Sequence, residues 1–381
     1  MHVAFALLTL FPGRVGGSET NARGLLREFA SGNGPEEVTV LANKLVELAY
    51  GEYEGGPIRL HRVRTYRSGD STSTRAFAMV FARAFPRAVS RDVPRDPEVF
   101  HYPLTVPIPA TDRPRVVSLY DIQHHDLPGF FSRAERRYRR WAYDGAARSA
   151  ALVVTSSAFT KTRVVDLIGV APERIEVVHL GLDRERFRPT GEDDERLLQG
   201  LEVPARFLLY PANFWPHKNH RRLFEALALI QDREMALVLT GQDYGKSRAL
   251  RAQAGSVADR VSHLGHVPAE ALPALYRAAE ALVFPSLYEG FGSPALEAMA
   301  CGCAVAASDR TSLPEICGDG ALLFDAGSAE AIAAAIDRLL SDRGLRNRLQ
   351  SSGMQRTAQF TWESAAARHR AIYERAAATS G

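Results

Sequence analysis

The chain has 381 residues, of which 46% are hydrophobic, and this is enough to form two domains with a core each. Its 47 lysines and arginines nearly balance 44 aspartates and glutamates, which argues against a nucleic-acid partner. Three cysteines without metal or disulfide spacing, no basic leader and no apolar run of ~18 residues predict a soluble cytoplasmic protein.

The first half of the chain predicts alternating strands and helices. Short apolar runs predict strands at residues 3–8, 37–41, 58–63, 99–102, 115–121, 151–155 and 174–178, and helical spacing recurs at 76–90 and 133–149. Gly16 and Gly17 stand between the first strand and a helix that runs to about Ala30. Glycines at such a junction form a plain turn or admit a phosphate at the helix N-terminus.

Four polar side chains crowd just past the strand at 115–121, namely Asp121, His124, His125 and Asp126. A hydrogen-bonded loop and the lip of an active site are both consistent with this pattern. The spacing does not match a zinc ligand set, so we predict no metal site.

The helix at 133–149 is strongly basic, with aromatic residues between its arginines. A solvated helix face is one interpretation. Attraction to an anionic membrane surface or to a lipid-phosphate acceptor is another.

The second half is more regular. Residues 184–204 are charged and carry glycines and prolines typical of a linker. Strands are predicted at 206–210, 235–240, 261–264, 281–285 and 303–307, with helices between them. Two more helices are predicted at 328–340 and 342–354. This alternation of strands and helices indicates a doubly wound parallel sheet. Lys218 and Asn219 precede a helix that starts near His220, where a lysine beside free N–H groups suits a pyrophosphate.

The most informative stretch follows the predicted strand at 281–285. Glu289 and Glu297 are eight residues apart, and Gly290 and Gly292 flank Phe291. Ser293 is expected to cap a helix with Pro294 in its first position, and Gly302 to end it. Glu289 is then on the strand-to-helix turn and Glu297 about one turn inside the helix. In a parallel sheet this edge binds ligands.

This stretch resembles the E-x7-E motif of the large family of retaining GT-B glycosyltransferases that includes bacterial mannosyltransferases and sucrose- and glycogen-synthase-like enzymes. The resemblance covers most of the chain and is strongest from about residue 205 to 325. It implies an α/β fold of two doubly wound, Rossmann-like domains that face each other across a cleft. It also implies an acceptor-side domain over 1–185, a linker over 186–204, a nucleotide-sugar domain over 205–360, and a final helix over 361–381 that packs back on the first domain.

The resemblance further implies roles for individual residues. Glu289 would hold the donor sugar and Glu297 the ribose, while Lys218 and the turn of Gly290, Phe291 and Gly292 would hold the diphosphate. Gly16 and Gly17 would face the same phosphates, and Gly241 and Val267 would line the nucleotide site. Asn213 stands near the place of the family's usual arginine, and it cannot supply a guanidinium fork.

One position departs from the family in the first half. The family's histidine at the end of the strand at 115–121 is replaced by Tyr120. Either Tyr120, with Asp121 beside it, or one of the histidines His124 and His125 is therefore expected to serve there.

We therefore predict a hexosyltransferase that needs no cofactor or metal. It would move a sugar, with mannose as the first candidate, from a GDP- or UDP-linked donor to a hydroxyl of a glycan or lipid-phosphate-linked acceptor, with retention and at the inner face of a membrane. The alternatives are a nucleotide-sugar epimerase of the same fold, a glycosidase that uses the two glutamates, and a non-catalytic nucleotide-sugar-binding protein.

Overall fold

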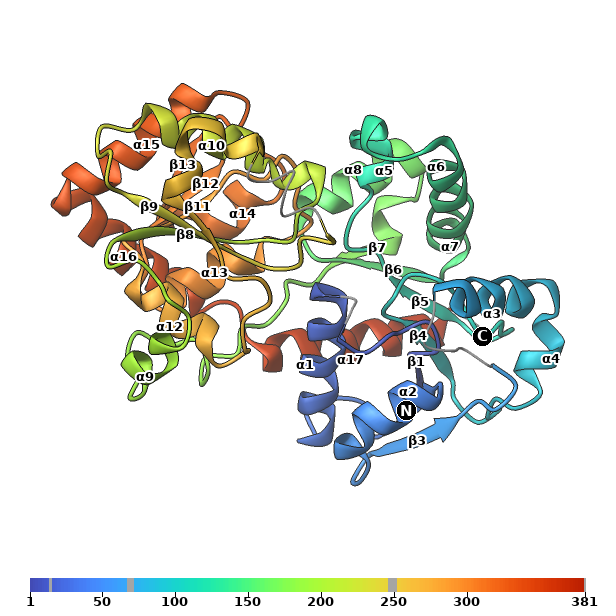
Figure 1. The fold of residues 1–381 in the computed structure, drawn as a ribbon. Helices are drawn as coiled ribbons and strands as arrows, with labels where there is room; N and C mark the ends of the chain where they lie inside the picture. Colours follow the sequence, from blue (N-terminus) through green and yellow to red (C-terminus); the bar gives the residue numbers. More distant parts are fainter. Residues whose placement is uncertain (14–15, 67–71, 246–251, 380–381) are drawn as a thin grey trace. The chain divides into compact units, whose positions relative to one another are not determined.

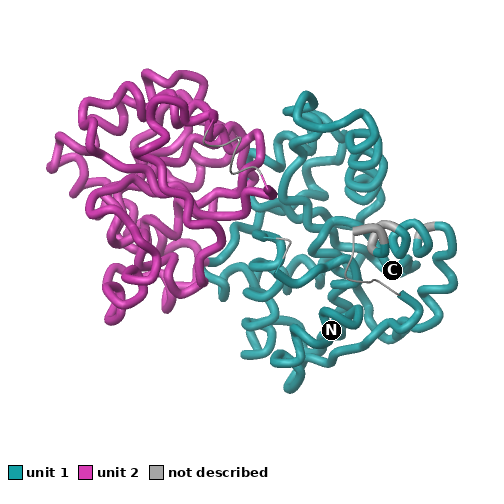
Figure 2. The backbone as a smooth tube through the Cα atoms, viewed as in Figure 1, with its two compact units in different colours: residues 1–181, 361–381 teal, residues 182–360 magenta. Residues whose placement is uncertain are grey.

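The computed structural model describes residues 1–13, 16–66, 72–245 and 252–379. The chain divides into two compact units, which are coloured separately in Figure 2. The first unit comprises residues 1–181 and 361–381, and the second comprises residues 182–360. No helix of the described residues combines the length and the apolar character needed to cross a bilayer.

The first unit is built on a seven-stranded parallel sheet in the order β3-β2-β1-β4-β5-β6-β7. Its strands are β1 (His2–Ala6), β2 (Glu37–Ala42), β3 (Ile58–Arg62), β4 (Val99–Tyr102), β5 (Arg115–Ser118), β6 (Leu152–Thr155) and β7 (Ile175–Val177). Along β1, Val3 and Phe5 belong to one apolar cluster and Ala4 belongs to the cluster on the other face. Both faces of the sheet are therefore buried, and this is why its strands are continuous apolar runs in the sequence.

Helices cover both faces of this sheet (Figure 1). They are α1 (Gly17–Ala30), α2 (Lys44–Tyr50), α3 (Thr72–Ala84), α4 (Pro86–Ser90), α5 (Gln123–Asp126), α6 (Arg133–Arg139), α7 (Gly145–Ser149), α8 (Ala158–Ile168) and α17 (Trp362–Ala378). Short 3-10 turns are η1 (Gly51–Tyr53), η2 (Pro128–Phe130) and η4 (Pro172–Arg174), and η3 (Arg140–Asp144) is a π-helical turn.

Three sequence predictions for the first unit need correction. The helix expected over 76–90 is broken before Pro86, because proline has no N–H to continue the helical hydrogen bonds. The basic helix over 133–149 is interrupted by η3. The strand expected over 115–121 ends at Ser118, which leaves Tyr120 and Asp121 on the loop that follows.

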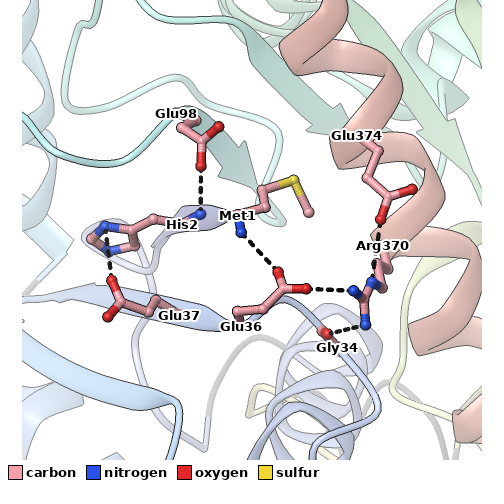
Figure 3. Close-up of polar contacts among 8 residues, drawn as sticks. All are labelled: Met1, His2, Gly34, Glu36, Glu37, Glu98, Arg370 and Glu374. Carbon is pink, nitrogen blue, oxygen red and sulfur yellow. Dashed lines mark hydrogen bonds and ion pairs between the residues drawn. The ribbon is translucent and has the colours of Figure 1, made fainter.

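The last helix, α17, completes the first unit and lies beside α1 (Figure 1). Trp362 of α17 packs so closely on Gly24 and Gly181 that a Cβ at either glycine would come within 2.4 Å of its ring. Near the middle of the helix, Arg370 pairs with Glu36, which also accepts a hydrogen bond of 2.8 Å from the Met1 amine (Figure 3). Packing and polar contacts thus tie α17 to the N-terminal strands.

The second unit contains a six-stranded parallel sheet in the order β10-β9-β8-β11-β12-β13. Its strands are β8 (Phe207–Pro211), β9 (Ala236–Thr240), β10 (Val261–His263), β11 (Ala281–Phe284), β12 (Val305–Ser308) and β13 (Ala321–Phe324). Its helices are α9 (Asp194–Gln199), α10 (His220–Leu229), α12 (Ala271–Ala278), α13 (Ser293–Ala300), α14 (Leu313–Cys317), α15 (Ala329–Ser341) and α16 (Arg343–Thr357), with 3-10 turns η5 (Pro216–Lys218), η6 (Gly255–Arg260) and η7 (Gly318–Gly320).

The doubly wound sheet expected from the sequence is confirmed, with two additions. Sequence analysis missed the edge strand β13, which is only four residues long. The segment 186–204, expected to be a linker, contains α9, and Asp194 of that helix pairs with Arg277 of α12 at 2.5 Å.

The strand order of the second unit reverses between β8 and β11. The chain proceeds from β8 outward to β9 and β10, and then returns to place β11 on the other side of β8. At such a reversal the connections leave in opposite directions, so a crevice opens at the carboxyl ends of the two strands. In the first unit the same reversal occurs between β1 and β4.

Candidate active site

Lys218 and Glu289 meet at the reversal between β8 and β11. Lys218 ends the turn that follows β8, and Glu289 follows β11. The Lys218 Nζ atom lies 2.5 Å from the Glu289 Oε1 atom, and the two side chains are 17% and 12% exposed. The two loops that the sequence singles out therefore converge at one edge of one sheet, with a cation and a carboxylate side by side.

The backbone around Lys218 is held by hydrogen bonds to neighbouring strands. Asn219 adopts a left-handed conformation, and its Nδ2 atom donates to the carbonyls of Pro285 (3.1 Å) and Ala326 (2.8 Å). The hydroxyl of Tyr210 donates to the Lys218 carbonyl at 2.7 Å. These bonds fix the point from which the lysine side chain extends, so its ammonium group is positioned before any ligand binds.

The turn after Glu289 is held by a second loop, which follows β12. The backbone N–H of Glu289 donates to Thr311 Oγ1 at 3.0 Å, and the Ser312 hydroxyl lies 3.0 Å from the Glu289 carbonyl and 2.9 Å from that of Phe291. By its local pattern, the sequence of residues 309–315 predicts only a turn and the start of a helix. Their role was missed because the contact spans more than twenty positions, and no local pattern reports it.

Gly292 permits the sharp entry into α13. Its φ is 105°, and a Cβ there would lie 2.5 Å from Leu313 Cδ2, so both the conformation and the packing require glycine. The sequence prediction that Ser293 is the N-cap is wrong by one residue. Gly292 is the N-cap and Ser293 is the first helical residue, whereas Gly302 ends the helix in a left-handed conformation as expected.

Glu297 lies one turn inside α13 and is partly exposed. The hydroxyl of Tyr276, from α12, donates to its Oε2 atom at 2.9 Å. Burial raises the pKa of Glu297, and the Tyr276 hydrogen bond and the charge of Arg186 oppose this rise. Tyr276 is a second partner that the sequence did not reveal, again because it is distant along the chain.

Three other candidates also follow strands at this edge. Asn213 follows β8, and its Oδ1 atom accepts a hydrogen bond from the Gln242 N–H at 2.7 Å. Gly241 follows β9 with φ 116°, and a Cβ there would lie 2.9 Å from the backbone of Ala212. Val267 follows β10 and is buried. All three are therefore near the carboxyl ends of the strands that flank Lys218.

In the first unit, Gly16 and Gly17 lie at the N-terminus of α1. Gly16 has a φ of 67°, and no heavy atom lies within 4 Å of a Cβ built at either glycine. Both glycines are exposed, as the first residues of a helix that receives an anion at its N-terminus are expected to be.

A cavity of about 210 Å³ opens beside the reversal between β1 and β4. Most of its lining side chains carry a hydroxyl or a carboxylate: Thr9, Ser18, Thr105, Tyr120, Tyr138, Tyr143 and Asp121. Met79, Leu104 and Val106 supply its apolar walls.

Tyr120 and Asp121 therefore share a cavity, and His124 is not among the residues that line it. Burial raises the pKa of Tyr120 to about 12, and its hydroxyl accepts a hydrogen bond from Asn21. Tyr120 is thus neutral at physiological pH and can act only through its hydroxyl.

His124 is fully buried and contacts Asp144 instead. Its Nε2 atom lies 3.1 Å from Asp144 Oδ1, and the Nε2 atom of His125 lies 2.9 Å from Asp144 Oδ2. Burial alone would raise the pKa of Asp144, but the hydrogen bonds from the two imidazoles lower it overall. The ligand-type atoms of these three residues lie within 4.8 Å of one another. The two imidazoles thus contact different oxygens of one carboxylate, and the cluster holds α5 against η3.

Comparison with known proteins shows to which family the chain belongs. Residues 15–186 match the family model of Glycosyltransferase Family 4, and residues 194–356 match that of Glycosyl transferases group 1. The O-antigen chain mannosyltransferase B of Escherichia coli is 32% identical over 254 residues, which are 65% of this chain and 67% of that protein. This chain belongs to the group 1 glycosyltransferases.

The chain is also similar to a second mannosyltransferase and to a solved structure. An MMP alpha-(1->4)-mannosyltransferase of Mycolicibacterium hassiacum is 35% identical over 240 residues, which are 61% of this chain and only 56% of that protein. The sucrose-phosphate synthase of Thermosynechococcus elongatus superimposes over the whole of both chains with a TM-score of 0.80 and 22% identity. That similarity shows a shared GT-B fold and says nothing of the substrate.

Proposed function

We propose that this glycosyltransferase moves a hexosyl unit from a nucleotide-diphosphate donor to a hydroxyl of a glycan or lipid-linked acceptor, with retention of the anomeric configuration. Mannose is the first candidate for the sugar. The Lys218–Glu289 pair at the β8–β11 reversal carries the proposal, because it places a cation for a diphosphate within 2.5 Å of a carboxylate for sugar hydroxyls. The two relatives named above for mannosyl transfer support the choice of sugar.

The main task of the second unit is to stabilise the departing diphosphate. Lys218 supplies a fixed positive charge, and the N–H groups at the start of α13 supply oriented dipoles. These groups are positioned by the hydrogen bonds of Asn219, Thr311 and Ser312, so little reorganisation is needed when charge develops. Because a cation and backbone donors occupy the role that a divalent ion has elsewhere, we expect turnover without a metal or other cofactor.

The nucleotide would lie along the same edge. Glu297, one turn inside α13, would accept hydrogen bonds from the ribose hydroxyls, and Gly241 and Val267 would line the base. Asn213 has its side-chain oxygen engaged by Gln242, so phosphate neutralisation depends on Lys218. The exposed N–H groups at Gly16 and Gly17 form a second candidate phosphate site in the first unit.

We propose that retention arises because the acceptor attacks from the side on which the diphosphate leaves. The bond between the anomeric carbon and the phosphate oxygen breaks, the bond to the acceptor oxygen forms, and the acceptor proton passes to the leaving phosphate. Glu289 would hold the sugar hydroxyls through this step. The acceptor would be positioned by Asp121 and by the neutral hydroxyl of Tyr120, which stands in place of the family's histidine.

A thermal-shift series with GDP, UDP and ADP tests the donor first. We expect one nucleotide to stabilise the protein, and the matching nucleotide sugar then to transfer its sugar to an acceptor with the same anomeric configuration, in EDTA as well as in Mg²⁺. An altered sugar formed from donor alone would instead indicate an epimerase. Tight donor binding without transfer or hydrolysis would indicate a binding protein.

A further inference from the structure

Two aromatic side chains are exposed together at the carboxyl edge of the second sheet. Trp215, on the loop after β8, is 47% exposed, and Tyr244, on the loop after β9, is 51% exposed. Their ring centroids are 5.0 Å apart, and the ring planes are tilted by 53°. We call this pair the aromatic platform. Tryptophan is highly buried on average, so a half-exposed tryptophan that packs on a second exposed ring indicates a contact surface for a ligand.

The two loops that carry the platform are joined by backbone hydrogen bonds. The Phe214 N–H donates to the Gln242 carbonyl at 3.1 Å, and the Gln242 N–H donates to Asn213 Oδ1 at 2.7 Å. Phe214 precedes Trp215 directly, and Gln242 is two residues before Tyr244. The rings therefore hold their positions without a ligand, so a ligand that binds them has little ordering to offset.

The backbone of Tyr244 is strained. Its φ is 53°, in the left-handed region, which glycine and asparagine adopt readily and a bulky side chain rarely does. Strain of this kind is retained mostly at functional sites. A tyrosine that is both strained and half exposed contributes little to the core, so a ligand explains its ring better than the fold does.

The platform adjoins the Lys218–Glu289 pair. The backbone N–H of Lys218 donates to the Trp215 carbonyl at 2.9 Å, so Trp215 caps the same 3-10 turn, η5, that ends in Lys218. Such a turn rises about 2 Å per residue, which puts the two backbones about 6 Å apart. A ligand on the platform would therefore lie beside the sugar and diphosphate proposed for Lys218 and Glu289.

The surroundings of the platform suit an uncharged sugar ring. The described residues of the two loops, 213–218 and 241–245, include one lysine, Lys218, which pairs with Glu289, and one acid, Asp243. They also include the amides of Asn213 and Gln242. The C–H face of a sugar packs on aromatic rings, while amides and carboxylates bond the hydroxyls at its rim. A phosphate would meet the Asp243 carboxylate instead, and the two rings are too close to admit a planar base between them.

We infer that Trp215 and Tyr244 bind an uncharged sugar ring of the acceptor glycan, next to the ring that receives the transferred sugar. The reacting hydroxyl would lie at the donor sugar, and a neighbouring ring of the same glycan would pack on the platform. This inference rests on the proposed function. It narrows the acceptor to a glycan of more than one ring, so the enzyme would extend an existing chain.

Binding of free sugars tests the platform without any transfer. Isothermal titration of the full chain, with the preferred nucleoside diphosphate present, would compare manno-, gluco- and galacto-oligosaccharides with their monosaccharides. We expect at least one oligosaccharide to bind ~10-fold or more tightly than its monosaccharide, and Trp215→Ala and Tyr244→Asn each to remove this gain. Tyr244→Phe retains the ring and should retain the gain. Asparagine suits the left-handed position, so Tyr244→Asn should melt no lower than the wild type.

Transfer kinetics separate acceptor binding from catalysis. With an oligosaccharide acceptor, Tyr244→Asn should raise the acceptor KM at least ~10-fold, whereas kcat at saturation should change much less. The matched control is Phe85→Ala in the first unit. Phe85 is 58% exposed, and its ring centroid lies 5.2 Å from that of Phe81. The control should change neither the acceptor KM nor oligosaccharide binding.

Several results would overturn the inference. They are a panel in which no oligosaccharide binds more tightly than its monosaccharide, and an equal loss in Phe85→Ala. A loss of nucleotide affinity in Tyr244→Asn as large as the loss of acceptor affinity would make the base the occupant. Flotation with lipid vesicles that Trp215→Ala abolishes would make a membrane the occupant. No transfer to any acceptor by the wild type, with platform-dependent oligosaccharide binding intact, would refute the proposed function and leave the sugar-binding platform standing.

Discussion

Substitution of Glu289 should raise the affinity for the nucleotide, whereas substitution of its partner Lys218 should lower it. Glu289→Gln leaves the shape of the turn but removes a charge 2.5 Å from Lys218, so the ammonium no longer has to be shared with a carboxylate. Two unit negative charges about 6 Å apart repel each other by about 1 kcal/mol when the effective dielectric constant is about 55, between the values for water and for the protein surface. The nucleoside diphosphate should therefore bind about 5-fold more tightly to Glu289→Gln, whereas turnover falls at least ~100-fold with the loss of a transition-state contact.

Lys218→Ala should do the reverse for affinity. It removes the cation and leaves Glu289, only 12% exposed, beside the phosphate site. We expect nucleotide affinity to fall ~10-fold or more and the donor KM and kcat to worsen together. Isothermal titration with the preferred nucleoside diphosphate, together with steady-state kinetics, measures both effects.

Glu225→Gln is the matched control, because Glu225 forms ion pairs with Arg221 and Arg222 on the surface of α10. It should alter neither affinity nor turnover. The reasoning is refuted if Glu289→Gln weakens nucleotide binding as much as Lys218→Ala does, or if Glu289→Gln turns over at a near-normal rate.

Three further predictions concern the surroundings of the site. Gly292→Ala should cost about 1–3 kcal/mol in denaturant unfolding, because a left-handed residue gains a Cβ 2.5 Å from Leu313, whereas Gly200→Ala, at a right-handed position in open space, should stay within ~0.5 kcal/mol of the wild type. Tyr120→Phe should lower kcat about 10-fold at unchanged melting temperature, and His124→Gln should mainly lower the melting temperature. If His124→Gln instead lowered kcat and Tyr120→Phe lowered only the melting temperature, His124 would be the residue that serves in place of the family's histidine. Burial lowers the pKa of His369 from 6.5 to about 4, so its contribution to stability is complete above pH 6.5 and is lost as the pH falls toward 4. His369→Leu should therefore reduce the acid-induced loss of unfolding free energy by about 3 kcal/mol, and an unchanged pH profile would show that His369 is protonated as easily in the folded chain as in the unfolded one.

The parts of the fold that sequence predicts well are those with local causes. The strands of both sheets are short, continuous apolar runs because parallel strands between two helix layers are buried on both faces. Helix ends carry their own signals, such as Thr361, whose hydroxyl caps α17, and Gly302 at the end of α13. The errors also have local causes. Pro86 divides a helix whose apolar spacing continues across it, and Ser293 competes with Gly292 for the cap position.

The candidate site is predictable in its residue types but not in its contacts. The glycine-flanked Glu289 and the lysine at a helix mouth each predict a ligand-binding turn, because strand, glycine and helix start are consecutive in the sequence. Tyr276 and Thr311 carry no such pattern. Each is about twenty residues from the glutamate it contacts, and only the packing of α12 and the loop after β12 brings it there.

The sequence by itself determined the fold class and, through its motifs, the family, and it supplied the residues that we propose for the donor site, because periodicity, helix caps and glycine turns are written into consecutive positions. Tertiary structure decided which of these residues act together. The reversal of strand order between β8 and β11 puts Lys218 beside Glu289 across seventy intervening residues, and burial against Asp144 removes His124 from the cavity that Tyr120 and Asp121 share. Strand order and burial depend on how the whole chain packs, so no local pattern encodes them.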